Sequence, residues 1–265
     1  MLLPHDDRGS GDAVVLLHAG VADRTQWRDH LEPLARAGHR VVAVDLPGFG
    51  DAPESSGPHA PWRDVLDTMD ALSIDRAALV GNSAGAGVAL RVAAVAPDRV
   101  AALVLISPGL PGAEPSPQLA TAWAAEEEAL ERGDVDAAVA AVVDAWTLPD
   151  ASADVRDRVA AMQRRAFVTQ LATTDFTEAP DPVQDNPAIL SDLQIDALCL
   201  AGGRDMPDFR DGARTLAASL HRARHAEIAD AGHLAPLETP DELRALVLEF
   251  LASVAGPAGG GPAPG

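Results

Sequence analysis

The sequence predicts an α/β fold, in which helices flank a mostly parallel β-sheet. Short apolar runs alternate with longer helix-forming stretches near both ends of the chain, the pattern typical of strand–helix–strand units. With 265 residues, of which 47% are hydrophobic, the chain can bury one sizeable core. The segment 110–191 interrupts the alternation, because it is helix-forming and contains no strand-like run. We therefore expect one core domain with a helical insertion.

The predicted strands are short runs rich in Val, Leu, Ile and Ala. One of them, 197–202, is continuously apolar, as expected for a strand buried on both faces of a parallel sheet. Residues 1–12 are polar and leave room for at most one further short strand. The six predicted strands are 13–18, 40–45, 77–81, 100–107, 197–202 and 225–228.

The insertion is predicted to be helical because its residues favour helices. A proline-rich stretch, 108–117, leads into Glu126-Glu127-Glu128 and the alanine-rich run 137–143. The last ten residues contain only Gly, Pro and Ala, a composition typical of a disordered tail. The expected division is a core of 1–109 and 192–255, a helical insertion of 110–191 and a disordered tail of 256–265.

A nucleophile is predicted at Ser83. The pentapeptide Gly81-Asn82-Ser83-Ala84-Gly85 lies between a predicted strand and the alanine-rich stretch 86–96. In such a turn the small glycines permit a strained backbone that exposes the serine hydroxyl. The amide of Ala84, in the first helical turn, would point at the same spot and stabilise an oxyanion. The alternative is that Ser83 is an ordinary helix N-cap.

A serine hydroxyl becomes nucleophilic only with a base and a group that orients this base. Among eight histidines, His233 fits best, because it lies in a small-residue loop after the last predicted strand. Asp205 follows an earlier strand and precedes His233, as the order Ser, Asp, His requires. Asp208 and Asp211 are rivals, but they fall at a helix start, where the helix dipole already explains an acid.

These residues and their order resemble the α/β-hydrolases that use a serine nucleophile. The resemblance extends from about Ala13 to Val254 and departs from the family pattern at Ala19 and Ala52, where glycine and serine are usual. It implies a lid formed by the helical insertion that the family carries after its sixth strand, which here follows the predicted strand 100–107, and a second oxyanion donor at Gly20. The matching landmarks are His18-Ala19-Gly20, Asp45 to Ala52, Gly81 to Gly85, Gly202 to Asp205 and Gly232-His233.

The resemblance implies hydrolysis of a small-molecule carboxylic ester or lactone through an acyl-enzyme, with a triad of Ser83, Asp205 and His233. A serine at this turn argues against the branches of the family that use an aspartate nucleophile. Carbon–carbon hydrolases, thioesterases and perhydrolases share the same landmarks and stay open as alternatives. So do a cofactor-free lyase or cyclase and a small-molecule receptor without turnover.

The candidate substrate pocket combines residues of the insertion with residues in or near the loop His18-Ala19-Gly20, called here the oxyanion loop. Trp123, Trp146 and Phe167 are large apolar residues of the insertion, and the alternative is that they pack it onto the core. His18 ends a strand beside Gly20. Asp23 lies close by and either reads substrate polarity or caps the helix that carries Trp27; we favour capping.

The composition of the chain limits the binding partners, cofactors and cellular compartment that we expect. A formal net charge of −20 disfavours nucleic acid and anionic membranes as partners. The expectation of a small-molecule substrate comes from the family resemblance. The single cysteine, Cys199, excludes an internal disulfide, and the chain lacks a signal-like apolar start and a membrane-length run, so we expect a cytoplasmic protein. It also lacks nucleotide-binding loops and zinc-spaced Cys/His clusters, and we expect neither a metal nor a cofactor. The oligomeric state does not follow from composition.

Overall fold

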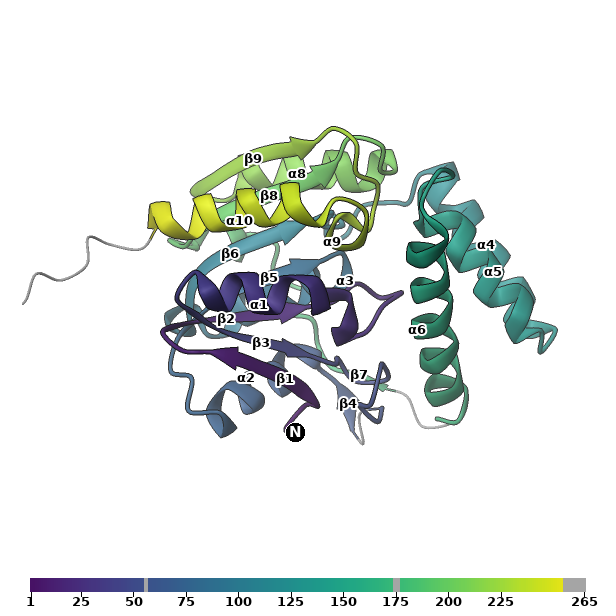
Figure 1. Cartoon of the computed structure of the whole chain (residues 1–265), viewed down its shortest axis with the longest axis horizontal. Coiled ribbons are helices and arrows are strands. Elements are labelled where there is room, and N and C mark those ends of the chain that lie inside the picture. Colours follow the sequence, from purple (N-terminus) through teal and green to yellow (C-terminus); the bar gives the residue numbers. More distant parts are fainter. Residues whose placement is uncertain (55–56, 174–176, 255–265) are drawn as a thin grey trace, which may run out of the picture.

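The computed structural model describes residues 1–54, 57–173 and 177–254, and the predicted tail 256–265 lies outside them. The described residues form a seven-stranded sheet in the order β1-β3-β2-β5-β6-β8-β9 (Figure 1). All neighbours pair in parallel except β1 and β3, which are antiparallel. The α/β prediction is therefore confirmed. The strands are β1 (His5–Gly9), β2 (Asp12–Leu17), β3 (His39–Val44), β5 (Ala77–Asn82), β6 (Val100–Ile106), β8 (Asp196–Gly202) and β9 (Arg222–Ile228).

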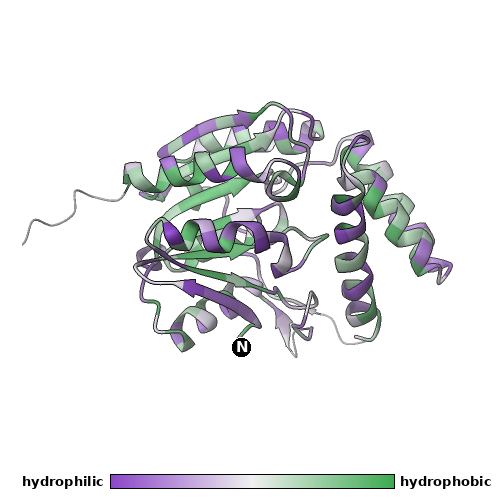
Figure 2. Cartoon of the chain, viewed as in Figure 1, coloured by the Kyte–Doolittle hydropathy of each residue, from purple (hydrophilic) through white to green (hydrophobic). Residues whose placement is uncertain are grey.

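The edge strands differ from the central ones in polarity. Figure 2 shows hydrophobic central strands and hydrophilic residues along β1 and β9. Edge strands have one unpaired side, and β1 has the sequence HDDRG, in which every side chain is polar or absent. The polar leader thus forms one short strand, consistent with the room that the sequence leaves for it.

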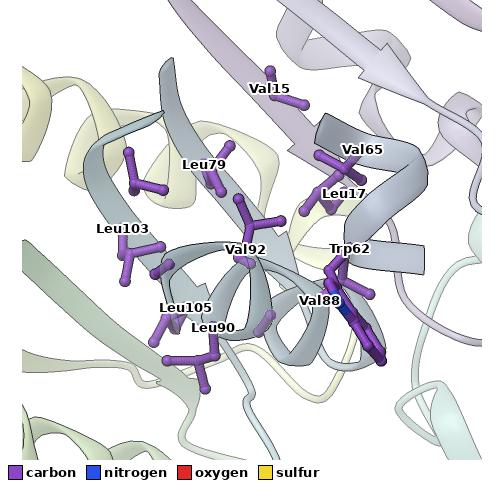
Figure 3. Close-up of a cluster of buried hydrophobic side chains, with 14 of the residues drawn as sticks. Val15, Leu17, Trp62, Val65, Leu79, Val88, Leu90, Val92, Leu103 and Leu105 are labelled. Atoms are coloured by element: carbon purple, nitrogen blue, oxygen red, sulfur yellow. The ribbon is translucent and has the colours of Figure 1, made fainter. Parts of the chain in front are cut away.

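Helices cover both faces of the sheet because strand residues alternate between the faces. Val15 and Leu17 pack with residues of α2, α3 and α8, whereas Val14 and Leu16 pack with residues of α1 and α10. Figure 3 shows the first of these layers, where Val88 and Val92 of α3 lie against the sheet. The helices of the core are η1 (Arg24–Trp27), α1 (Arg28–Arg36), α2 (Pro61–Ala71), α3 (Ala84–Val95), η2 (Pro97–Arg99), α8 (Pro207–Ser219), α9 (Ala235–Glu238) and α10 (Pro240–Val254).

The insertion follows β6 and stands beyond the carboxyl ends of the strands (Figure 1). Its helices share a hydrophobic cluster with core residues, among them Val21, Phe209 and Leu234. The expectation that the insertion contains no strand is wrong, because β7 (Thr177–Glu178) pairs in parallel with β4 (Pro58–His59). This two-residue ladder is too short to leave a recognisable pattern. The helices of the insertion are α4 (Pro117–Glu131), α5 (Val135–Trp146), α6 (Ala153–Leu171) and α7 (Ile189–Asp192).

No helix within the described ranges combines the length and the apolar composition that crossing a bilayer requires.

Candidate active site

Ser83 lies at the strained turn between β5 and α3. Its backbone has φ 53° and ψ −113°, a left-handed value that a serine rarely adopts. A Cβ at Gly81 would lie 2.3 Å from the carbonyl oxygen of Gly85, and one at Gly85 would lie 2.3 Å from that of Leu17. Both glycines are therefore required by close backbone approach. Ser83 stands at the N-cap position of α3, but its side chain makes no capping hydrogen bond. The ordinary capping role does not describe it.

Asp205 and His233 are in contact, as predicted. Asp205 follows β8 and His233 lies in the loop between β9 and α9. The Nδ1 atom of His233 lies 3.1 Å from each carboxylate oxygen of Asp205, and the two residues are 5% and 7% exposed. The carboxylate also accepts a 2.7 Å hydrogen bond from the amide of Met206, which fixes its orientation. With Nδ1 facing Asp205, the imidazole keeps Nε2 for proton exchange.

The two rival acids have other partners. Asp208 accepts hydrogen bonds from the amide and hydroxyl of Ser116, at 2.7 and 2.6 Å, and so holds the start of α4. Asp211 pairs with Arg214 in the same helix at 2.7 Å. Asp205 is thus the acid of this group that meets His233.

Ser83 and His233 open onto one cavity of about 910 Å³. Gly20 and Ala84, the predicted oxyanion donors, line the same cavity, and a Cβ at Gly20 would lie 3.4 Å from that of Ala84. Ala84 is the first residue of α3, so its amide has no partner within the helix. The volume is at the upper end of the range of small-molecule sites. The apolar wall of the cavity is formed by Val21, Leu46, Phe49, Trp62, Val88, Leu110, Leu130, Trp146 and Phe209.

The candidate pocket residues separate into two groups. Trp123 and Trp146 line the cavity, whereas His18, Asp23 and Phe167 are not among the described residues that do. Trp146 packs against His233 with ring centroids 4.6 Å apart. Phe167 is buried in the hydrophobic cluster of the insertion, so packing describes it better than substrate contact.

His18 is a structural residue rather than a pocket residue. It is fully buried, its Nδ1 donates to the carbonyl of Ala19 at 2.8 Å, and its Nε2 accepts from the amide of Leu46 at 2.9 Å. Burial lowers the pKa of this imidazole. The pocket assignment of His18 is therefore wrong, because both ring nitrogens are occupied by the backbone of two loops.

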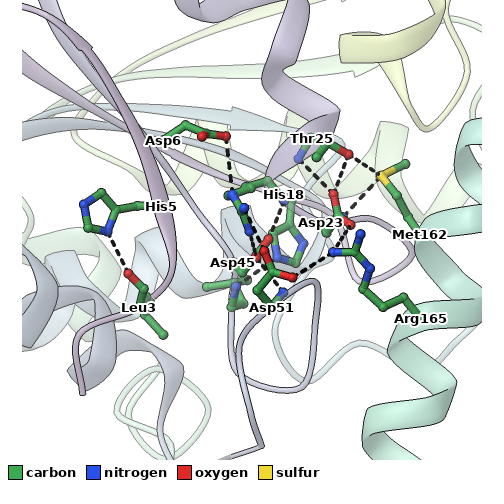
Figure 4. Close-up of polar contacts among 12 residues, drawn as sticks. Leu3, His5, Asp6, His18, Asp23, Thr25, Asp45, Asp51, Met162 and Arg165 are labelled. Atoms are coloured by element: carbon green, nitrogen blue, oxygen red, sulfur yellow. Dashed lines mark hydrogen bonds and ion pairs between the residues drawn. The ribbon is translucent and has the colours of Figure 1, made fainter.

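Asp23 is the N-cap of η1, which agrees with the favoured capping interpretation. Its carboxylate accepts a 2.8 Å hydrogen bond from the amide of Thr25, and Arg165 of α6 lies 3.9 Å away (Figure 4). The amide of Arg24 donates to Asp45 at 2.8 Å, and its guanidinium also pairs with this buried carboxylate. These contacts hold the N-terminal end of η1, shortly after Gly20.

Sequence reasoning missed much of the cavity wall. Trp62 comes from α2, Phe49 from the loop after β3, and Phe209 from α8, where it packs on His233 at a centroid distance of 4.2 Å. Each is one apolar residue in an ordinary amphipathic context. The position of Phe209 just after the predicted acid loop is the signal that could have revealed it.

The charged part of the cavity is mainly acidic. Three carboxylates of α4, those of Glu126, Glu127 and Glu131, line it, and burial raises the pKa of Glu126. Arg91 is the one arginine among the described lining residues. Its Nε donates to Asp181 at 2.9 Å, so this cation is already neutralised by a carboxylate.

Comparison with known proteins agrees with this geometry. Residues 14–246 match the model of the alpha/beta hydrolase family. A 2-hydroxy-6-oxononadienedioate/2-hydroxy-6-oxononatrienedioate hydrolase of Burkholderia vietnamiensis (strain G4 / LMG 22486) is 29% identical over 93% of this chain and 90% of its own length. A 2-hydroxy-6-oxo-6-phenylhexa-2,4-dienoate hydrolase of Comamonas testosteroni is 38% identical over 42% of each chain. This chain thus aligns with about two fifths of that second relative.

Two solved structures share the fold. A thermophilic esterase from Thermogutta terrifontis superposes with a TM-score of 0.79 at 24% identity, covering 96% of this chain and 94% of its own. The enol-lactonase from Burkholderia xenovorans LB400 gives 0.74 at 23% identity, covering 94% and 96%. The strained serine turn, the histidine–aspartate contact and the match over most of the sequence lead to one conclusion: this chain belongs to the alpha/beta hydrolase family.

Proposed function

We propose that this hydrolase cleaves a small carboxylic ester or lactone that carries no carboxylate of its own, through an acyl-enzyme on Ser83. The contact of His233 Nδ1 with both oxygens of Asp205, beside a cavity that also contains Ser83, is the observation that carries the proposal. Such a constellation supplies a nucleophile, a base and the group that orients the base.

In the proposed reaction, the hydroxyl oxygen of Ser83 attacks the substrate carbonyl carbon while His233 Nε2 takes the hydroxyl proton. The amides of Ala84 and Gly20 stabilise the oxyanion of the tetrahedral intermediate. The imidazolium, held by Asp205, returns the proton to the departing alkoxide. Water then attacks the acyl-enzyme with the same base, which releases the carboxylic acid and restores Ser83.

The helical insertion acts in this proposal as the lid of the active site. Trp123 of α4 and Trp146 of α5 line the cavity, together with Trp62 of α2 in the core. In this role the two indole rings reduce the access of water to the acyl-enzyme and strengthen the oxyanion contacts. These residues favour a substrate with an apolar acyl or alcohol group.

The cavity charges distinguish the ester proposal from the carbon–carbon hydrolase alternative. The dienoate and dienedioate hydrolases similar to this chain act, by their names, on substrates with one or two carboxylates. In this cavity the arginine already pairs with Asp181, and α4 adds Glu126, Glu127 and Glu131. Like charges in a partly buried site repel, so the lining favours a substrate without a carboxylate.

The test is hydrolysis of p-nitrophenyl esters from acetate to laurate and of γ- and δ-lactones. We expect turnover by the wild type and by Ser219→Ala, an exposed serine at the end of α8, and none by Ser83→Ala. Wild-type turnover in Ser83→Ala would reject the mechanism. Water incorporation in the product separates hydrolysis from a lyase or cyclase reaction.

The carbon–carbon hydrolase is the second candidate, because the dienedioate hydrolase of Burkholderia vietnamiensis aligns over 93% of this chain. Its test is the loss of absorbance of a 2-hydroxy-6-oxo-dienoate. Turnover of the dienoate at rates well above those of every ester and lactone would move the assignment to this reaction. Binding without turnover of any of these compounds would favour the receptor alternative.

A further inference from the structure

A chain of buried amide hydrogen bonds links the three loops of the candidate active site. The backbone N–H of Ala19 donates to Gln26 Oε1 at 3.0 Å, and Gln26 Nε2 donates to Asn82 Oδ1 at 2.9 Å. Asn82 Nδ2 donates in turn to the carbonyl oxygens of His233, at 3.1 Å, and Ile106, at 3.3 Å. The side chains of Gln26 and Asn82 are fully buried.

This series of hydrogen bonds meets the proposed catalytic residues at three points. Ala19 directly precedes Gly20, Asn82 directly precedes Ser83, and the carbonyl at the far end belongs to His233 itself. The series of hydrogen bonds therefore joins three segments: the oxyanion loop with Gly20, the turn with Ser83 (the nucleophile turn) and the loop with His233 (the histidine loop). Gln26 and Asn82 themselves are not among the described residues that line the cavity. We propose that Gln26 and Asn82 are positioning residues that set the distances between the oxyanion amide, the Ser83 hydroxyl and the imidazole.

The polarity of the two ends explains why both residues are primary amides. A backbone N–H can only donate and a backbone carbonyl can only accept, so the linker needs an acceptor at the Ala19 end and a donor at the His233 end. Two amides in series supply this order and satisfy each other between the ends. A carboxylate at either position has no donor, and an apolar residue leaves buried backbone groups unpaired.

Gln26 is itself held in place. It lies in η1, whose N-cap is Asp23 and whose Arg24 amide is bound by Asp45. This short helix thus presents Gln26 in one orientation toward the oxyanion loop. In this proposal the buried hydrogen bonds of Asp23 and Asp45 hold η1, the helix that carries Gln26, and do not act on the substrate.

The effect of a Gln26 substitution on kcat rests on the proposed serine-hydrolase function. Its effect on the hydrogen exchange of the Ala19 amide does not. A displacement of about 1 Å in a catalytic group can cost about 100-fold in rate, so we expect Gln26→Leu to lower kcat by about 10- to 100-fold. The KM should change by less than about twofold, because the cavity wall is untouched. A boronic acid, which mimics the tetrahedral oxyanion, should bind more weakly by about the same factor as kcat falls.

The experiment compares wild type, Gln26→Leu, Gln26→Glu, Asn82→Leu and the double variant Gln26→Leu/Asn82→Leu. Gln163→Leu is the matched control, because Gln163 is a buried glutamine of α6 that does not line the cavity. The readouts are kcat, KM, the inhibition constant of phenylboronic acid, labelling of Ser83 by a fluorophosphonate, and hydrogen exchange of the Ala19 amide. We expect faster exchange at the Ala19 amide by at least about tenfold in the two variants that carry Gln26→Leu, and a double variant no worse than the poorer single one.

The assignment is overturned if Gln26→Leu matches Gln163→Leu in kcat, boronate affinity and exchange at Ala19. Should Gln26→Leu fail to fold, Gln26→Glu, which keeps the acceptor for Ala19 and loses the donor to Asn82, decides by kcat and boronate affinity: wild-type values of both would overturn the assignment. If the wild type neither turns over esters nor reacts with the fluorophosphonate, the proposed function fails. In that case, hydrogen exchange of the Ala19 amide in Gln26→Leu alone tests whether Gln26 holds the oxyanion loop.

Discussion

The carboxylate of Glu238 accepts a hydrogen bond from the backbone amide of Leu148 at 3.1 Å, which ties the helical insertion to the core. Its second oxygen accepts from the amide of Gly232 at 2.8 Å, directly before the candidate base. Gly232 and Leu148 are also close, since a Cβ at Gly232 would lie 2.8 Å from Leu148 Cδ2. One side chain thus holds the loop between α5 and α6 against the histidine loop.

Glu238→Gln should destabilise the protein by about 1–3 kcal/mol, because an amide can accept only one of these two hydrogen bonds and leaves a buried N–H unpaired. Urea denaturation measures the free energy of unfolding. Glu242→Gln, an exposed glutamate in the first turn of α10, is the control and should stay within about 0.5 kcal/mol of wild type. Equal stability of Glu238→Gln and the control would contradict a structural role of this carboxylate.

Glu238 also predicts a pH dependence. Burial raises its pKa above the usual range of a glutamate, so the folded state binds the proton more tightly than the unfolded state. The contribution of this group to stability is present below the unfolded pKa and is lost as the pH rises through the raised folded pKa. Over that window the free energy of unfolding of wild type should fall with pH relative to Glu238→Gln. Parallel curves for the two proteins would show that Glu238 titrates normally.

Asp205→Asn should lower kcat by about 10⁴-fold with little change in KM, because an amide no longer holds the imidazole in the tautomer with Nδ1–H. Steady-state kinetics on the best p-nitrophenyl ester measures this. Asp211→Asn is the matched control and should retain kcat, because Asp211 is exposed and pairs with Arg214 on the surface of α8. A comparable loss in both variants would point to general damage around α8.

Gly81→Ala should prevent stable folding or destabilise by more than about 3 kcal/mol, because its Cβ would meet the backbone of Gly85 and Ala86 at 2.3 to 2.5 Å. The backbone of a tight turn cannot move aside as a side-chain end can. Gly57→Ala is the control, since no atom of the described residues lies within 4 Å of the position that its Cβ would occupy. Thermal unfolding of both variants checks the prediction, and a Gly81→Ala protein of wild-type stability would refute the close approach at this turn.

Glu126→Gln should raise kcat/KM for an ester with a terminal carboxylate, such as mono-p-nitrophenyl glutarate, by about fivefold. This corresponds to roughly 1 kcal/mol of repulsion between two charges in a partly solvated site. The neutral p-nitrophenyl butyrate should react as with wild type. Glu114 is an exposed carboxylate that is not among the described residues lining the cavity, so Glu114→Gln should leave kcat/KM unchanged for both esters. An unchanged preference in Glu126→Gln would mean that the cavity charge does not select the substrate.

The local parts of the molecule could be anticipated from the order of residues. Apolar runs predicted the central strands to within a few residues, and the G-x-S-x-G turn predicted the place where β5 gives way to α3. Asp205 and His233 could be paired in advance because both follow parallel strands, whose carboxyl ends meet at one edge of the sheet. Their catalytic roles, with that of Ser83, stay predictions until the kinetics are measured.

Partners between distant segments were decided only by the folded arrangement. His18 was expected in the pocket, but its second ring nitrogen meets Leu46, and the pairing of Arg91 with Asp181 spans 90 residues of chain. The link from Gln26 to Asn82 left no motif either. Periodicity and turn chemistry act over a few neighbouring residues, and so they are legible along the chain. A buried polar contact depends instead on how whole helices and loops pack, which many small packing energies determine together.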